Sequence, residues 1–493
     1  MAYLQSITNF VPFLADNLGF SEASMRMLLT PLIGLPLAYI HRTYLYNKSA
    51  TTKHLYTIWW GLSLAYFNYG LDIKHSAFTV LLNYLLLNII GGTQVSVALS
   101  FGLNMGYLLT SYGLYASDDY DMTWTTPQCI LTLRMIGLAF DIYDGHKPVD
   151  KLSSDQKTSC IAKVPSFIEM VAYTYFYGGY FVGPQFPMRR YLDHVHGRLM
   201  SDSDDRPPQC VQASLVSFKW GVFYSLVVAL IVPFYPNSFL FSSDFTDASF
   251  LYKIYIVAIW GHIAFVKYCC IFSLFDAVCV MTGMTYNGKD EAGNALWDTC
   301  IGAKAWDWEV SLTMKDVIAS MNISTNMWAG KYLYKRLKFL GNRYISQLCT
   351  MIFLAMWHGW YVGYYITFAF EMAVINFEQQ MTYVINKIPI LRKLSESENL
   401  KVPMYILRKM WQLEYLGYPL ISFTFLRWRH IKVVHGALFY YPYFLFFGWP
   451  VIYYAVVLPI LKSKERKERK AAKTNMVGGE SNGSNGNNHT KED

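Results

Sequence analysis

The feature that most constrains this chain is the recurrence of long apolar stretches with almost no charge. Crossing a bilayer as a helix takes about 20 predominantly apolar residues. Clear candidates are the stretches 25–40, 54–69, 76–90, 95–115, 211–235, 252–281, 344–370 and 433–461, and weaker ones are 128–140, 167–186 and 410–425. We therefore expect an all-α polytopic membrane protein with about eleven transmembrane or re-entrant helices.

The composition supports a membrane protein over a soluble one. Charged residues make up 15% of the chain and hydrophobic residues 53%, whereas a soluble domain carries about 25% charged residues. The 39 Tyr and 14 Trp suit the headgroup level of a bilayer, where amphipathic rings accumulate. Several apolar stretches contain Gly or Pro, and a broken helix must satisfy its backbone inside protein or beside a water-filled cavity. We expect these helices to surround an internal chamber.

Charge is unevenly distributed along the chain. The net charge is +8, but much of the excess follows the last apolar stretch as the run KSKERKERKAAK at 462–473. Under the positive-inside rule this run predicts a cytosolic C-terminus, so nucleic acid is not an expected partner. The sequence is divided into a membrane domain at 1–461 and a tail at 462–493 that is first basic and then Gly/Asn/Ser-rich and disordered.

Ionisable groups inside apolar stretches are candidates for function because burying them is costly. Among the histidines only His262, His358 and His435 sit well inside such stretches. His358 has the richest surroundings, since it is expected deep in one long helix at 344–370 with Gly359 and Gly363 beside it. The spacing of the cysteines shows no CxxC pair and no pattern typical of a metal site.

A second candidate region lies upstream of His358. The segment 321–328 offers hydroxyl and amide groups, and the segment 331–338 is expected to be an amphipathic helix with a cationic face formed by Lys331, Lys335, Arg336 and Lys338. Such a face suits phosphates or anionic headgroups. Simple anchoring of the helix at the membrane surface explains the same pattern.

These segments carry a resemblance. The runs MNISTNMW at 321–328, YLYKRL at 332–337 and WHG at 357–359 resemble the signature block of the membrane-bound O-acyltransferase family. Upstream, LRMIGLAFDIYDG at 133–145 and YFYGGYFVGPQF at 175–186 look like its lysophospholipid branch, and most like lysophosphatidylcholine acyltransferases that favour polyunsaturated acyl groups.

The resemblance implies a reaction and its residues. The family's catalytic histidine falls on His358 and its catalytic asparagine on Asn322. The implied reaction moves an acyl group from acyl-CoA, as co-substrate without a metal or further cofactor, to the free hydroxyl of a lysophospholipid during phospholipid remodelling in the endoplasmic reticulum membrane. A neutral imidazole can accept the hydroxyl proton near pH 7. Asn322 could orient that imidazole or donate to the oxyanion, and sequence leaves both roles open.

The donor site and the competing functions complete the sequence-based expectations. Lys331, Lys335, Arg336 and Lys338, together with Trp357, are expected to bind acyl-CoA. One alternative is a lipid transporter or scramblase whose path is lined by the intramembrane residues Arg134, Asp141, Lys267 and Asp276. The other is an acyltransferase that acts on a secreted protein or a neutral glyceride.

Overall fold

The computed structural model describes residues 10–115, 122–200 and 210–468 as a helical bundle. Within these ranges no β-strand forms, and the extended pairing is limited to the isolated bridges between Lys289 and Ala295 and between Ala303 and Met321. The helical fold confirms the predicted class. The tail beyond residue 468, which includes the end of the basic run, lies outside the described residues.

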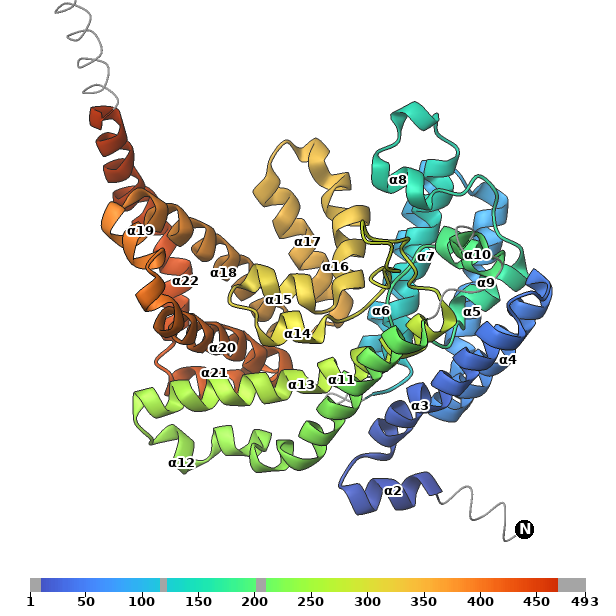
Figure 1. The fold of residues 1–493 in the computed structure, drawn as a ribbon, viewed down its shortest axis with the longest axis horizontal. Coiled ribbons are helices and arrows are strands. Elements are labelled where there is room, and N and C mark those ends of the chain that lie inside the picture. Colours follow the sequence, from blue (N-terminus) through green and yellow to red (C-terminus); the bar gives the residue numbers. More distant parts are fainter. Residues whose placement is uncertain (1–9, 116–121, 201–209, 469–493) are drawn as a thin grey trace, which may run out of the picture.

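The helices follow one another in two sets (Figure 1). The first set comprises α2 (Phe10–Leu18), α3 (Glu22–Tyr44), α4 (Ala50–Tyr69), α5 (Ile73–Ile90), α6 (Gln94–Leu114), α7 (Thr125–Gly145), α8 (Ser154–Ser159), α9 (Phe167–Thr174) and α10 (Met188–Val195). The second set comprises α11 (Val211–Leu230), α12 (Ser243–Thr246), α13 (Phe250–Thr282), α14 (Ala305–Glu309), α15 (Met314–Ser320), α16 (Ile323–Ala329), α17 (Arg343–His358), α18 (Val362–Lys387), α19 (Pro389–Ser395), α20 (Lys401–Phe425), α21 (Trp428–Ala437) and α22 (Tyr441–Ile452).

The long helix α13 connects the two sides of the bundle. It packs against α3 among the N-terminal helices and against α20 among the C-terminal ones, while α14 to α17 stand between the two sides (Figure 1). Where α13 crosses α20 the backbones touch, since a Cβ atom on Gly261 would lie 2.2 Å from the Cα of Gly417. Glycines allow this close approach of two membrane helices. This crossing fixes α20, which also packs against α18, relative to α13.

Short helices near the site begin at caps that the sequence encodes locally. Helix α15 starts at a capping box in which the Thr313 hydroxyl and the Asp316 carboxylate each accept a backbone N–H of the other's residue. Helix α9 starts at an equivalent box formed by Ser166 and Glu169. Helices of this length are marginal alone, so caps and packing define where they begin.

Five helical stretches in the described ranges are long and apolar enough to cross a membrane: Glu22–Tyr44, Ala50–Ile90, Val211–Phe241, Phe250–Thr282 and Tyr441–Glu468. They agree with predicted apolar segments. The predicted total of about eleven is not reproduced by this criterion, because several other segments are broken, short or more polar. The stretch 167–186 is helical only as far as Thr174, and the stretch 433–461 contributes its span only from Tyr441 onward, because α21 ends at Ala437.

The largest correction concerns the stretch 344–370. It was expected to be one long helix, but it consists of α17 and α18 with a break after His358. Gly359 has φ +139°, a region of backbone conformation open mainly to glycine. The start of α18 then packs closely on α20, since a Cβ on Gly363 would lie 2.0 Å from the carbonyl oxygen of Ser422. His358 therefore lies at a helix end and not deep inside a helix.

Candidate active site

Asn322 lies in the tight turn between α15 and α16, with a left-handed backbone conformation (φ 51°, ψ 36°). This conformation is uncommon for residues with side chains, and asparagine adopts it more readily than most. The chain on both sides is held by an upstream loop, because Ile323 donates its N–H to the carbonyl of Gly302 (3.1 Å) and Ala303 bridges to Met321. The backbone of Asn322 is thus fixed, while its amide makes no hydrogen bond to another described residue.

His358 is the last residue of α17. Its ring lies among aromatic rings, with centroid distances of 5.1 Å to Phe423, 5.4 Å to Tyr364 and 5.5 Å to Phe368. Two of these rings come from α18 and one from α20, so three helices meet at the imidazole. These contacts fix the position of the ring by packing on carbon faces.

The end of α17 is anchored to the N-terminal helices by aromatic hydrogen bonds. The indole N–H of Trp357 donates to the carbonyl of Cys129 (2.8 Å), and that of Trp360 donates to the carbonyl of Leu109 (2.8 Å). Trp357 is 4% exposed, so its indole is occupied by packing and by this bond. Direct contact of Trp357 with substrate stays a prediction.

Helices α16 and α17 pack together and bring the two candidate catalytic residues onto neighbouring elements. Trp328 of α16 stacks on Phe353 of α17 with centroids 5.9 Å apart. The two side chains of interest, those of Asn322 and His358, share no hydrogen bond in the described structure. Sequence reasoning did not single out Trp328, although its position in the run 321–328 was a signal.

The cationic segment differs in form from the predicted amphipathic α-helix. It is a π-helical turn (Gly330–Tyr334) followed by a 3₁₀ turn (Arg336–Leu340). Because of this change in helical pitch, the cations of the segment point toward both α7 and α8. Lys331, Lys335 and Arg336 have partners on these helices. Lys338 is exposed and has no ion pair with a described residue.

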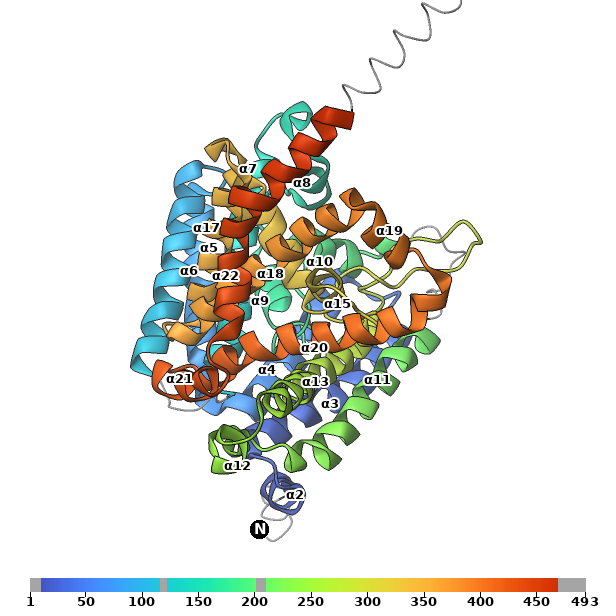
Figure 2. The same ribbon diagram turned by 90° about the vertical axis from the view of Figure 1, so that its left-hand side faces the viewer.

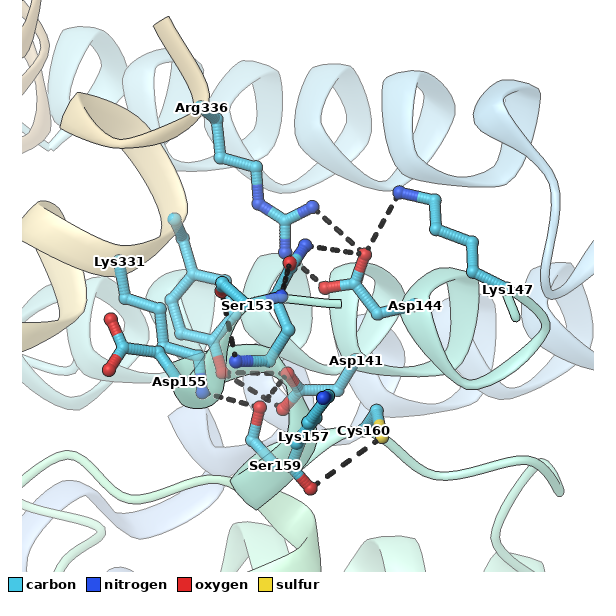
Figure 3. A network of polar contacts seen from close by, with 12 residues as sticks. Asp141, Asp144, Lys147, Ser153, Asp155, Lys157, Ser159, Cys160, Lys331 and Arg336 are labelled. Carbon is cyan, nitrogen blue, oxygen red and sulfur yellow. Dashed lines mark hydrogen bonds and ion pairs between the residues drawn. The ribbon is translucent and has the colours of Figure 1, made fainter. Parts of the chain in front are cut away.

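Three aspartates of α7 and α8 meet these cations in what we call the α7–α8 network (Figure 3). Arg336 donates to both carboxylate oxygens of Asp144, and Lys335 pairs with Asp155. Lys331 donates to the hydroxyl of Ser159, which in turn donates to Asp141 (2.6 Å). These pairings were not predicted from the sequence. Asp141 and Asp144 lie three residues apart on α7, and this spacing was the available signal.

The strongest contact of the α7–α8 network is the ion pair between Asp144 and Arg336. Burial by itself raises the pKa of Asp144, but hydrogen bonds and charge from Arg336 and Lys147 hold that pKa below its ordinary value. The side chain of Asp144 is fully buried while that of Arg336 is largely so, and a bidentate pair in this setting is stronger than a surface ion pair. The network therefore joins the segment after Asn322 to α7.

Three of the four residues considered for a permeation path form hydrogen bonds within the protein. Arg134 donates to four backbone carbonyls, those of Tyr173, Thr174, Gly179 and Pro184. Asp141 accepts hydrogen bonds from Tyr332 and Ser159, and Asp276 accepts two backbone N–H groups. Lys267 is exposed. Three of the four thus support the fold around the candidate site.

Comparison with known proteins identifies the family of this chain. The model of the membrane-bound O-acyltransferase family matches residues 109–410, which include both Asn322 and His358. The human protein "Lysophospholipid acyltransferase 5" is 36% identical over 448 residues, covering 90% of this chain and 92% of the relative. Relatives of the same name from Drosophila melanogaster (37% over 446 residues, covering 90% of this chain and 89% of the relative) and Caenorhabditis elegans (30% over 450 residues, 91% and 95%) match over similar lengths. The chain belongs to the membrane-bound O-acyltransferase family and is an acyltransferase.

Proposed function

We propose that this protein transfers an acyl group from acyl-CoA to the free hydroxyl of a lysophospholipid. The observation that carries the proposal is its similarity, over about nine-tenths of both chains, to proteins named lysophospholipid acyltransferases. We further propose that lysophosphatidylcholine is the main acceptor, that the acyl chain is long and polyunsaturated, and that the reaction serves phospholipid remodelling. The resemblance of the segments 133–145 and 175–186 supports these finer points.

The proposed reaction begins with His358 as general base. Its neutral imidazole takes the proton from the lysolipid hydroxyl as that oxygen attacks the thioester carbonyl. The C–S bond then breaks, and the thiolate of CoA leaves with the proton that the imidazolium returns. The position of His358 at a helix end supports this role, because the aromatic rings of α18 and α20 hold the imidazole in place.

We propose that Asn322 stabilises the oxyanion formed during this attack. Its amide has no hydrogen-bond partner among the described residues and shares none with His358, which favours donation to substrate over orientation of the imidazole. A preorganised donor at a developing oxyanion contributes about 3 kcal/mol in other acyl-transfer sites.

The acyl-CoA donor is proposed to bind near the cationic segment. CoA carries several phosphate charges, whereas a phosphocholine lysolipid is zwitterionic and gains little from lysines. Lys338 is exposed, and Lys335 is exposed although it pairs with Asp155, which is also accessible, so both can meet a phosphate from solution, while Arg336 is held by the buried Asp144. The described end of the chain lies at the same end of the bundle as α8, so the donor is proposed to enter from the cytosolic side (Figure 2).

Replacing Lys335 and Lys338 together by Gln is expected to raise the KM for acyl-CoA. Contacts with phosphate that persist through the reaction are uniform binding, so kcat and the lysolipid KM should change little. Lys401→Gln, at an exposed lysine of α20, is the matched control. A well-expressed double variant with an unchanged acyl-CoA KM would leave membrane anchoring as the role of these lysines.

The topology of the tail is a separate expectation. We propose that the protein lies in the endoplasmic reticulum membrane with its C-terminus in the cytosol, supported by the basic run 462–473. Each Lys or Arg near an anionic leaflet is worth about 1 kcal/mol. A tag placed after Asp493 should be digested by protease added to sealed microsomes. Protection of the tag without detergent would place the tail in the lumen and contradict this topology.

The substrate proposal is tested with purified protein and a panel of acceptors. Lysophospholipids with different headgroups, a neutral glyceride and an acceptor peptide compete for one acyl-CoA, and the products are identified by mass spectrometry. We expect diacyl phosphatidylcholine to dominate. Acylation of the glyceride or the peptide alone would overturn the lysophospholipid proposal, while a different preferred headgroup would overturn only its finer part.

A further inference from the structure

Asp276 of α13 is a buried acid whose two oxygens are both bound by backbone. It is 1% exposed. One carboxylate oxygen accepts the N–H of Gly302 (2.7 Å), and the other accepts the N–H of Ala303 (2.9 Å). No Lys, Arg or His of the described chain forms an ion pair with it. Hydrogen bonds from N–H groups to a carboxylate are among the stronger ones, so the loop at these two residues is firmly attached to α13.

That loop also holds the chain on both sides of Asn322. Gly302 accepts the N–H of Ile323 through its carbonyl (3.1 Å), and Ala303 bridges to Met321. One residue further, Lys304 donates its N–H to the carbonyl of Ser320 (2.8 Å). Gly302 therefore donates its N–H to Asp276 and accepts from Ile323 through its carbonyl, while Ala303 donates to Asp276 and lies opposite Met321 in the bridge.

The turn needs such support because its conformation is unfavourable. A non-glycine residue in the left-handed region costs about 1–2 kcal/mol and persists only where the surroundings determine it. From inside the turn, the Asn326 amide donates to the carbonyls of Ile318 (3.2 Å) and Met321 (3.1 Å). From outside, the support is the loop bound by Asp276. Asn322 is thus held between two independent sets of hydrogen bonds.

We propose that Asp276 is a positioning residue for acyl transfer, which sets the direction of the Asn322 amide through residues 302–304. The proposal rests on the role of Asn322 stated above. Asp276 itself contacts no substrate in this account, since both of its oxygens are bound to backbone. Its effect should therefore appear in kcat, through the geometry of the oxyanion donor, with the KM of either substrate nearly unchanged.

The test is a double-mutant cycle between Asp276→Asn and Asn322→Ala in the purified full-length protein. An asparagine keeps one acceptor oxygen but turns an NH₂ group toward a backbone N–H, so one of the two hydrogen bonds is lost. We expect Asp276→Asn to lower kcat by roughly tenfold in the wild-type background, the size expected for one lost hydrogen bond. In the Asn322→Ala background it should lower kcat no further, because residues that act through one another are not additive.

The matched control is Glu414→Gln in α20. Glu414 is also a buried acid, 4% exposed, which accepts a hydrogen bond from Tyr441, but it has none with residues 300–323 in the described structure. Any factor by which Glu414→Gln lowers kcat should be the same in both backgrounds. If Asp276→Asn does not purify as a folded protein, Asp276→Glu, which keeps two acceptor oxygens on a longer chain, takes its place in the cycle.

The outcomes separate this inference from the proposed function. An unchanged kcat in Asp276→Asn, or an equal loss in both backgrounds, would overturn the positioning role and leave Asn322 as the proposed donor. An unchanged kcat in Asn322→Ala alone would overturn the role of Asn322 and the positioning role with it. The role of Asn322 is tested by Asn322→Ala alone, without any change at Asp276. Failure of the proposed function can therefore be told apart from failure of the positioning role.

Discussion

His358→Ala is expected to lower kcat by about 10²–10⁴-fold while the protein still inserts and folds. If His358 is the general base, as proposed, its loss removes the group that accepts the hydroxyl proton during attack on the thioester. The end of α17 is anchored by the indole hydrogen bonds of Trp357 and Trp360, so it should persist without the imidazole. Steady-state kinetics on the purified variant, with gel filtration to show that it is folded, measure the effect.

His262→Ala and His435→Ala are the controls. His262 stacks on Trp308 with centroids 4.5 Å apart, and His435 stacks on Tyr418 at 4.1 Å. Their loss should cost stability through packing and leave substantial activity. Wild-type turnover by folded His358→Ala, or equal losses in all three variants, would count against a catalytic base at His358.

Asn322→Ala should lower kcat by about 10²-fold, less than the histidine change, with both KM values nearly unchanged. Loss of one oxyanion donor typically costs this much, because the charge develops only in the transition state. The variant also places Ala in a left-handed conformation, which strains the turn by itself. The kcat of the purified variant alone therefore does not separate the amide from the backbone.

Asn322→Gly makes that separation. Glycine adopts φ 51° without strain but carries no amide. If the amide stabilises the oxyanion, the Gly variant should be about as slow as the Ala variant. Recovery of most of the wild-type kcat by Asn322→Gly would show that the turn matters and the amide does not.

Apolar runs predicted where most long helices lie, but not where they end. The run 344–370 is continuous in hydrophobicity, so periodicity could not indicate that it divides at Gly359. The break depends on a φ that glycine permits and on the close approach of Gly363 to the carbonyl of Ser422 on α20. A contact with a helix some 60 residues later leaves no local trace in the sequence, so the end of α17 could not be predicted.

Local sequence patterns also could not predict the partners of the charged residues. Lys335 and Arg336 were read as a free cationic face, yet they pair with Asp155 and Asp144, far away along the chain. Asp276 was named only as a residue that could line the path of a transporter, whereas in the structure both of its oxygens accept backbone N–H groups. The residue types indicated that burying these charges costs free energy. Only the fold identifies the partners that offset this cost.

The most direct test of the account reconstitutes the purified protein in lipid with lysophosphatidylcholine and labelled acyl-CoA. The account predicts diacyl product and free CoA in equal amounts, both dependent on His358. Movement of lysolipid between the leaflets without diacyl product, or product formation unaffected by His358→Ala, would contradict it.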